Sequence, residues 1–263
     1  MLATVTAAEY LKPMSSGRTC PVLLNCDRED GTTVTVVAKF SAFCEQKGIN
    51  LAREVVAACL AADLGLPIPV PVIVNIPADW PAIVPDQDRR LRISESAPFA
   101  FGSTFVTGGF APWTADTHLR EGMMDAAVSI FAFDAITQNP DRRADNPNCL
   151  VRGEEIRVID HELTFAHRMI LGWRPPWQVG GLNWLERRGS HIFSHDLKRT
   201  RIDWTFVEER WSAIGDARLA EYRAAVPAEW VRAPEEIDSA IELIRNARNN
   251  IDNCLTEMSR VLS

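Results

Sequence analysis

The sequence lacks the features that mark membrane proteins and proteins built on paired cysteines. No apolar run reaches the ~18 residues that a membrane-spanning helix needs. The N-terminal stretch MLATVTAAEYLKP contains an acid and no basic start, so no signal peptide is predicted. The six cysteines form no C-x-x-C pair, which indicates free, mostly buried thiols in a reducing compartment. We therefore expect a cytoplasmic protein with no membrane partner.

An excess of positive charge is also missing. The chain has 28 Lys and Arg against 35 Asp and Glu, a net charge of −7. Proteins that bind nucleic acid usually present a basic face, so nucleic acid is not the expected partner. The remaining composition, 46% hydrophobic with eight Trp and eleven Phe, is typical of a packed globular protein. A chain of 263 residues is long enough for one large domain or for two lobes.

The most informative stretch is 133–162. It places Asp141, Asn146 and Asp160 on two short loops joined by a predicted β-hairpin over 149–159. Phosphoryl transfer uses one carboxylate to orient the attacking hydroxyl and to accept its proton. A second carboxylate and an amide oxygen hold Mg²⁺ against the nucleotide phosphates. An Asp and an Asn at this spacing are also common in solvated turns, so the loop alone leaves both interpretations open.

The N-terminal part contains groups that could hold a nucleotide. A hairpin of two strands is predicted over 22–40, with Asp30-Gly31 at its tip. The loop before it is made of small residues: Ser15, Ser16 and Gly17. Backbone N–H groups of such a loop can cover phosphates, and Lys39 at the end of the returning strand can neutralise them. The loop lacks the G-x-G-x-x-G pattern, and a Lys at a strand end is often only a surface residue, so the grip on phosphates stays open.

A helix is predicted over 51–64, because its apolar residues recur at helical spacing and Gly65 follows it. Glu54 lies in the first turn of this helix. A kinase needs an acid here to hold the strand lysine, and Lys39 with Glu54 would be that pair. The helix dipole favours an acid in a first turn whatever the function, so both interpretations remain.

The other elements are predicted from periodicity and from turn residues. They are strands over 70–76 and 99–106, a loop with one short helical turn over 77–97, a helix over 117–136, and one long helix from residue 234 onward. Asp134 is expected to be a surface residue of its helix, with anchoring of the following loop as the alternative. His191 and His195 have no third ligand in view, so zinc is not predicted. The C-terminal helix is expected to pack on the larger lobe, with a dimer seam or partner contact as the alternative.

The two loops resemble those of one enzyme family. Asp141-Arg142-Arg143 followed by Asn146, and then Asp160-His161-Glu162, resemble the corresponding loops of HipA-like kinases and, more distantly, of phosphoinositide kinases. The small-residue loop, Lys39 and Glu54 precede them in the order found in protein kinases. From Met14 to the end of the segment after Asp160, the chain resembles the stand-alone HipA-like serine/threonine kinase domains of bacteria.

The resemblance implies an α+β, two-lobed protein-kinase-like fold. The small β-rich N-lobe with one helix is expected over 1–108, and the larger, mainly helical C-lobe over 109–263. The implied function is ATP- and Mg²⁺-dependent transfer of a γ-phosphate to a Ser or Thr hydroxyl of a protein substrate. The alternatives are a non-catalytic nucleotide-binding regulator, a pseudokinase that binds a regulatory partner protein, or a small-molecule kinase. The negative net charge disfavours a membrane-lipid substrate.

The resemblance also assigns residues. Asp141 is implied to be the catalytic base, and Asn146 and Asp160 the Mg²⁺ ligands, with Asn148 as a rival to Asn146. The remaining assignments follow the family pattern: Lys39, Glu54 and Arg142 belong with the catalytic group, and Ser15, Ser16, Gly17 and Lys39 bind the nucleotide.

Overall fold

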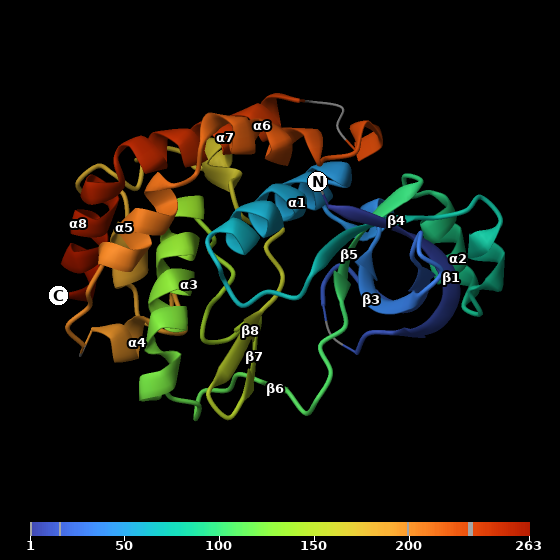
Figure 1. Cartoon of the computed structure of the whole chain (residues 1–263), viewed down its shortest axis with the longest axis horizontal. Helices are drawn as coiled ribbons and strands as arrows, with labels where there is room; N and C mark the ends of the chain where they lie inside the picture. Colours follow the sequence, from blue (N-terminus) through green and yellow to red (C-terminus); the bar gives the residue numbers. More distant parts are fainter. Residues whose placement is uncertain (1, 16, 199, 231–233) are drawn as a thin grey trace.

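The computed structural model describes residues 2–15, 17–198, 200–230 and 234–263 (Figure 1). The N-terminal part is rich in strands and the C-terminal part is mainly helical, which confirms the mixed α and β content expected from the sequence. The prediction for Ser16 falls on a residue outside the described ranges.

The strands of the N-terminal part close into a small barrel. Its strands follow the order β1, β2, β3, β5, β4 around the barrel. They are β1 (Ala3–Pro13), β2 (Val22–Asp27), β3 (Thr33–Lys39), β4 (Pro71–Asn75) and β5 (Phe99–Thr104). Strand β1 was not predicted from the sequence, although it closes the barrel by pairing antiparallel with β2 and parallel with β4. Valines from β2, β3 and β4 fill the interior.

The segment between β4 and β5 is more ordered than predicted. Instead of a loop with one helical turn, it forms a 3-10 helix, Trp80–Ile83, and then α2 (Gln87–Ser94). Asp86 caps α2, because its carboxylate accepts the backbone N–H of Arg89 at 2.7 Å. The expectation of a single helix in residues 1–108 was therefore wrong. The sequence signals for the second helix were the capping residue Asp86 and the apolar Trp80, which is buried.

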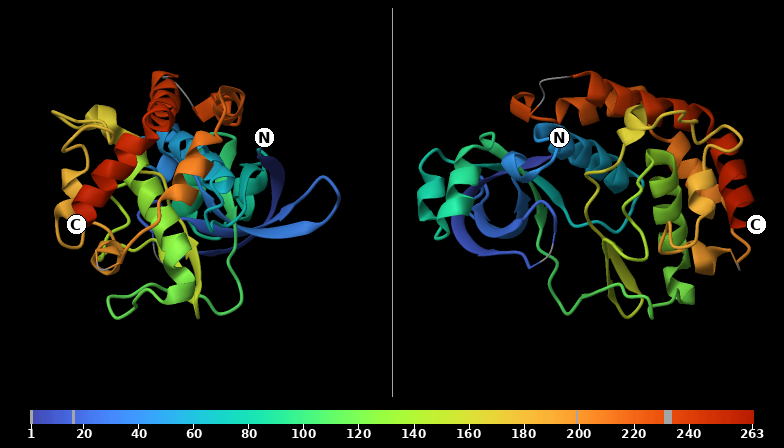
Figure 2. Two further views of the ribbon diagram at one scale, coloured as in Figure 1. Left: turned by 60° about the vertical axis from the view of Figure 1, so that its left-hand side comes forward. Right: turned by 180° about the vertical axis from the view of Figure 1, so that it is seen from behind.

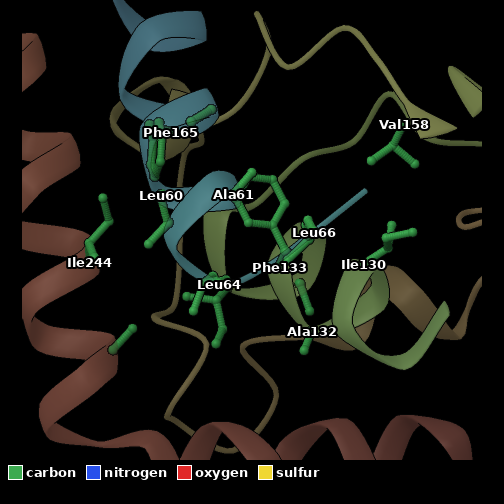
Figure 3. Packing of buried hydrophobic residues seen from close by; sticks show 14 of the residues in the cluster. Leu60, Ala61, Leu64, Leu66, Ile130, Ala132, Phe133, Val158, Phe165 and Ile244 are labelled. Atoms are coloured by element: carbon green, nitrogen blue, oxygen red, sulfur yellow. The ribbon is translucent and has the colours of Figure 1, made fainter. Parts of the chain in front are cut away.

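Helix α1 (Gly48–Asp63) corresponds to the helix predicted at 51–64, but it is buried on nearly all sides. It contacts α6 (Asp216–Ala224) and α7 (Glu235–Asn249) as well as the barrel strands β4 and β5. Its side chains belong to the hydrophobic cluster of the C-terminal part, and not to the barrel interior. Figure 3 shows Leu60 of α1, Phe133 of α3 and Ile244 of α7 in this cluster.

The C-terminal part combines helices with a small sheet. Strands β6 (Ala111–Pro112), β7 (Cys149–Arg152) and β8 (Glu155–Val158) form the sheet, in that order. The other helices are α3 (Met124–Thr137), α4 (Ser194–Leu197), α5 (Thr205–Ser212) and α8 (Ile251–Leu262). The right-hand view of Figure 2 shows α1 beneath α7, with the barrel and α8 at opposite ends of the molecule. None of the described helices is both long and apolar enough to cross a membrane.

Two helix boundaries differ from the predictions. Helix α3 begins at Met124, because a 3-10 turn over Glu121–Met123 precedes it. The predicted long C-terminal helix is two helices, broken at Asn250, whose backbone leaves the helical region (φ −127°, ψ 31°). The Asn250 side chain donates a hydrogen bond to the carbonyl of Asn246 at 2.8 Å, so it competes with the backbone ladder.

The N-terminus of α1 depends on a close backbone approach. A Cβ added to Gly48 would lie 2.2 Å from the carbonyl oxygen of Trp230, whose indole N–H donates to the Phe99 carbonyl at 2.8 Å. We expect Gly48→Ala to lower the free energy of unfolding by about 1–3 kcal/mol, since backbone atoms must move apart. Thermal or urea unfolding would measure the change. Gly215→Ala, where an added Cβ meets nothing within 4 Å, is the control. Equal stability of both variants would contradict the prediction.

Candidate active site

Lys39 lies at the end of β3 and is 7% exposed. Its Nζ atom is 2.8 Å from Oδ1 of Asp160, 2.9 Å from Oε2 of Glu54 and 3.2 Å from Oε2 of Glu162. Burial alone would lower the pKa of Lys39, but these three carboxylates outweigh burial and hold its pKa well above the ordinary value. The ammonium is therefore charged at neutral pH and joins β3 to α1 and to the loop after β8.

Glu54 faces inward from α1 and is almost completely buried, although it is an acidic residue. Its second oxygen, Oε1, accepts the backbone N–H of His161 at 2.9 Å. Burial would raise the pKa of Glu54, but Lys39 and His161 lower it to about 2, so the carboxylate stays ionised. Glu54 therefore links the barrel lysine to the loop that contains Asp160.

Glu162 follows Asp160 by two residues and reaches Lys39 from the same loop. Burial, with the charges of Asp160 and Glu54, raises the pKa of Glu162 to about 7 despite the contact with Lys39. Glu54, Asp160 and Glu162 each offer one oxygen, and these oxygens lie within 4.8 Å of one another. Three carboxylates against one ammonium leave an excess of negative charge, which suits a hard cation with oxygen ligands.

The loop after α3 presents Asp141 to the same cleft. Its Oδ2 accepts a hydrogen bond from the Asn148 side chain at 3.1 Å, and the Arg143 guanidinium lies 4.0 Å from its Oδ1. Asn146 also lines the cleft, and its backbone exchanges two hydrogen bonds of 3.1 Å with Arg143. The structure thus brings Asp141 and both candidate amides, Asn146 and Asn148, into one loop. Arg143, the arginine of this loop that lines the cleft, was given no role from the sequence.

Arg142 is placed differently from the expectation. Its side chain is fully buried, with Nε 2.6 Å from Oδ2 of Asp134, and it is not among the residues that line the cleft. Its Nη1 donates to the carbonyls of Asn148 at 2.6 Å and Ile159 at 3.2 Å. Its inclusion in the catalytic group is therefore corrected: Arg142 is a positioning residue that joins the Asp141 loop to the end of the hairpin.

Asp134 is also placed differently, because it is fully buried and not on the surface. Besides Arg142, it accepts the Asn139 side-chain N–H at 2.6 Å, and His191 Nε2 lies 3.1 Å away. Burial lowers the pKa of His191, with Arg142 adding to the effect, and Asp134 only partly opposes this, so the imidazole is neutral at pH 7. His191 therefore pairs with Asp134.

The small-residue loop between β1 and β2 reaches the cleft through part of its length. Gly17 lines the cleft, whereas the exposed Ser15 does not. Gly17 has a φ of +111°, and an added Cβ would lie 2.9 Å from Cδ of Pro21. This turn therefore favours glycine. A backbone hydrogen bond of 2.9 Å from Met14 to Pro21 closes the loop.

These groups surround a single cleft of about 940 Å³ between the barrel and the C-terminal part. Lys39, Asp141 and Asp160 line it together with arginines at positions 18, 92 and 143. Apolar side chains form another part of its wall: Val37, Phe101, Phe105, Leu150 and Ile159. The cleft is of a size that suits a nucleotide, with an apolar wall for a base and charged groups for phosphates.

A model of the HipA-like kinase family matches residues 7–260. The chain belongs to the HipA-like kinase family. The solved structure of a proinflammatory kinase of Helicobacter pylori, CtkA, is also similar, with a TM-score of 0.52 over 97% of this chain and 95% of that chain. The sequence identity is 12%, so this likeness concerns the fold alone. No curated protein matches the sequence.

Within this HipA-like kinase, the buried Asp134–Arg142 ion pair fixes the loop that presents Asp141. We expect Asp134→Ala to lower the free energy of unfolding by about 3–5 kcal/mol, because it leaves the Arg142 charge buried without a partner. Asp238→Ala breaks the exposed Arg223–Asp238 pair and should leave the stability within experimental error. Urea unfolding followed by circular dichroism would compare the two. Similar losses in both variants would contradict this assignment.

The same ion pair gives a pH dependence. Burial would raise the pKa of Asp134, but Arg142 and His191 lower it from 3.8 to about 2. Because the folded-state pKa is depressed, this carboxylate adds stability above about pH 4 that is lost as the pH falls toward 2. We expect wild-type protein to lose on the order of 2 kcal/mol more than Asp134→Asn over this window. Parallel pH profiles of the two proteins would exclude the effect.

Proposed function

We propose that this HipA-like kinase is an ATP- and Mg²⁺-dependent phosphotransferase that transfers the γ-phosphate to a Ser or Thr hydroxyl of a protein. The observation that supports it most strongly is the contact of Lys39 with both Glu54 and Asp160 on a cleft that Asp141 also lines. Kinase catalysis is mainly positioning and charge stabilisation, and this cluster supplies both.

Nucleotide binding rests on Lys39, Gly17 and the apolar wall of the cleft. Lys39 would exchange part of its contact with Glu162 for phosphate oxygens, while Glu54 keeps the ammonium in place. The backbone of Gly17 would cover the phosphates, because Gly17, unlike Ser15, lines the cleft. The adenine would lie against Leu150 and Ile159.

Metal binding rests on a donor set of hard oxygens, which fits Mg²⁺. Asp160 and the amide oxygen of Asn146 are the proposed ligands. Asn148, whose amide nitrogen donates to Asp141, remains the alternative oxygen donor. When bound, the ion would neutralise phosphate charge during transfer. Glu162 is a further oxygen donor within reach of Asp160.

Asp141 is the proposed base that orients the acceptor hydroxyl and accepts its proton. Asn148 fixes one carboxylate oxygen, which leaves the other for the hydroxyl. Arg143, 4.0 Å from that second oxygen, would face the transferred phosphoryl group and stabilise its charge. The bond to the hydroxyl oxygen forms as the bond between the β- and γ-phosphates breaks, and ADP leaves.

We also propose two lobes, with residues 1–108 as the N-lobe and 109–263 as the C-lobe. The two separate hydrophobic clusters support this division. Helix α1 is the exception, because it belongs to the N-lobe by sequence and to the C-lobe by packing.

A second candidate is a non-catalytic nucleotide-binding regulator that acts through a partner protein. The contact of Glu162 with Lys39 favours it, since a third carboxylate competes with phosphate for the ammonium. A small-molecule kinase would use the same residues as the first proposal, so only its acceptor would differ.

The first proposal is tested by measuring transfer of radiolabelled phosphate from ATP. The acceptor is either this protein itself or the proteins of a cell lysate. We expect Mg²⁺-dependent labelling that falls at least about a thousandfold in Asp141→Ala and in Asp160→Ala, since each variant removes a group that acts in the transition state. Both variants should remain folded by circular dichroism.

Asp238→Ala is the control, because Asp238, among the described residues, pairs only with the exposed Arg223 and does not line the cleft. Nucleotide binding without any transfer by the wild-type protein would favour the regulator. Undiminished transfer in Asp141→Ala or Asp160→Ala would refute the catalytic assignment.

A further inference from the structure

The segment that follows the Asp160 loop has a net charge opposite in sign to that of the whole chain. Residues 163–201 contain seven Lys and Arg but only two Asp and Glu, whereas the chain as a whole has 28 and 35. Residues 163–201 are therefore a basic segment in the C-terminal part of an acidic chain.

Part of this segment lies directly against the loop that presents Asp141. The turn formed by residues 187–190 is closed by a backbone hydrogen bond of 3.1 Å from Ser190 to Arg187. The backbone N–H of Ala144 donates to the carbonyl of Gly189 at 3.1 Å, and the N–H of Ile192 donates to the carbonyl of Arg142 at 3.1 Å. Gly189 has a φ of +77°, and an added Cβ would lie 3.6 Å from Cβ of Ala144. The turn is therefore fixed against Ala144, which lies three residues after Asp141 in the chain.

The two arginines of this turn are exposed. The neighbouring acid, Glu186, is held by Arg260, with Nη1 at 2.5 Å from its Oε1. Among the described residues, no carboxylate lies within ion-pair distance of Arg187 or Arg188, in contrast to Arg260, which pairs with Glu186 and Glu257. Their charges are thus available to a partner beside the loop that presents Asp141.

We propose that Arg187 and Arg188 form a docking site for acidic residues of the protein substrate, next to the hydroxyl that Asp141 orients. The inference rests on the proposed function and specifies its substrate class: Ser or Thr segments flanked by Asp or Glu. Two guanidinium groups beside the reacting hydroxyl attract carboxylates and repel basic segments.

A peptide fits this site better than an extended polyanion does. The basic turn is short, and the rest of the chain is strongly acidic, so a membrane surface or a nucleic acid would meet repulsion beyond the turn. A substrate segment needs to contact only the turn and the cleft.

The test compares Ser peptides flanked by Asp and Glu with peptides flanked by Asn and Gln. We expect wild-type kcat/KM to be about tenfold higher for the acidic peptides, mainly through KM. Arg187→Gln/Arg188→Gln should bring this ratio close to one, and Arg187→Glu/Arg188→Glu should make Lys-flanked peptides the better substrates. Lys12→Gln/Arg28→Gln removes the same charge from the barrel hairpin and should keep the wild-type ratio.

Fluorescence anisotropy with the same peptides separates this proposal from the kinase assignment. Preferential binding of acidic peptides that is lost in the Gln variant, without phosphate transfer, would support the docking site and refute the kinase proposal. Transfer with no preference for acidic peptides would refute the docking site alone. The docking site would also be overturned if the Gln variant loses binding to phosphatidylserine vesicles or to single-stranded RNA while its peptide preference is unchanged.

Discussion

A lysine buried with three carboxylates is the constraint on which the site depends. Removing the Lys39 ammonium from water is costly, and only its short contacts with Glu54, Asp160 and Glu162 offset that cost. These four groups come from a barrel strand, a buried helix and the loop after the hairpin. The charge cluster therefore joins the barrel to the helical part across the cleft. Since α1 is packed against α6 and α7, the C-terminal helices also contribute to the position of Glu54.

A second buried charge network positions the other side of the cleft. Asp134 and Arg142 are completely buried, and His191 reaches Asp134 from the segment after the Asp160 loop. Arg142 also binds the carbonyls at both ends of the hairpin, so the Asp141 loop and the Asp160 loop share one anchor. Removing either member would leave a charge without a partner in an apolar core, which is why such networks are sensitive to truncation. The buried Asp134–Arg142 pair thus holds the proposed catalytic loop in place from the core.

The charge of the surface around the cleft is uneven. The cleft interior has an excess of carboxylates, which suits a metal ion and its phosphates. The turn of residues 187–190, which hydrogen-bonds to Ala144 of the Asp141 loop, adds positive charge in a chain whose net charge is negative. A nucleotide with a cation and an acidic peptide would therefore meet complementary charges on adjacent surfaces. In this arrangement, the substrate preference would come from a loop that is held by the catalytic loop itself.

The sequence by itself determined the order of the chemical groups, the family, and the helices and strands with strong periodicity, such as α1 and the hairpin of β7 and β8. Those signals are local, since they depend on residues a few positions apart. The tertiary structure alone decided which of two adjacent arginines enters the core, because Arg142 and Arg143 have the same chemistry and differ only in what surrounds them. It likewise decided the burial of Asp134, the closure of the barrel by β1 and the break at Asn250. Each of these depends on partners distant in the chain or on competing hydrogen bonds, which a pattern of neighbouring residues does not record.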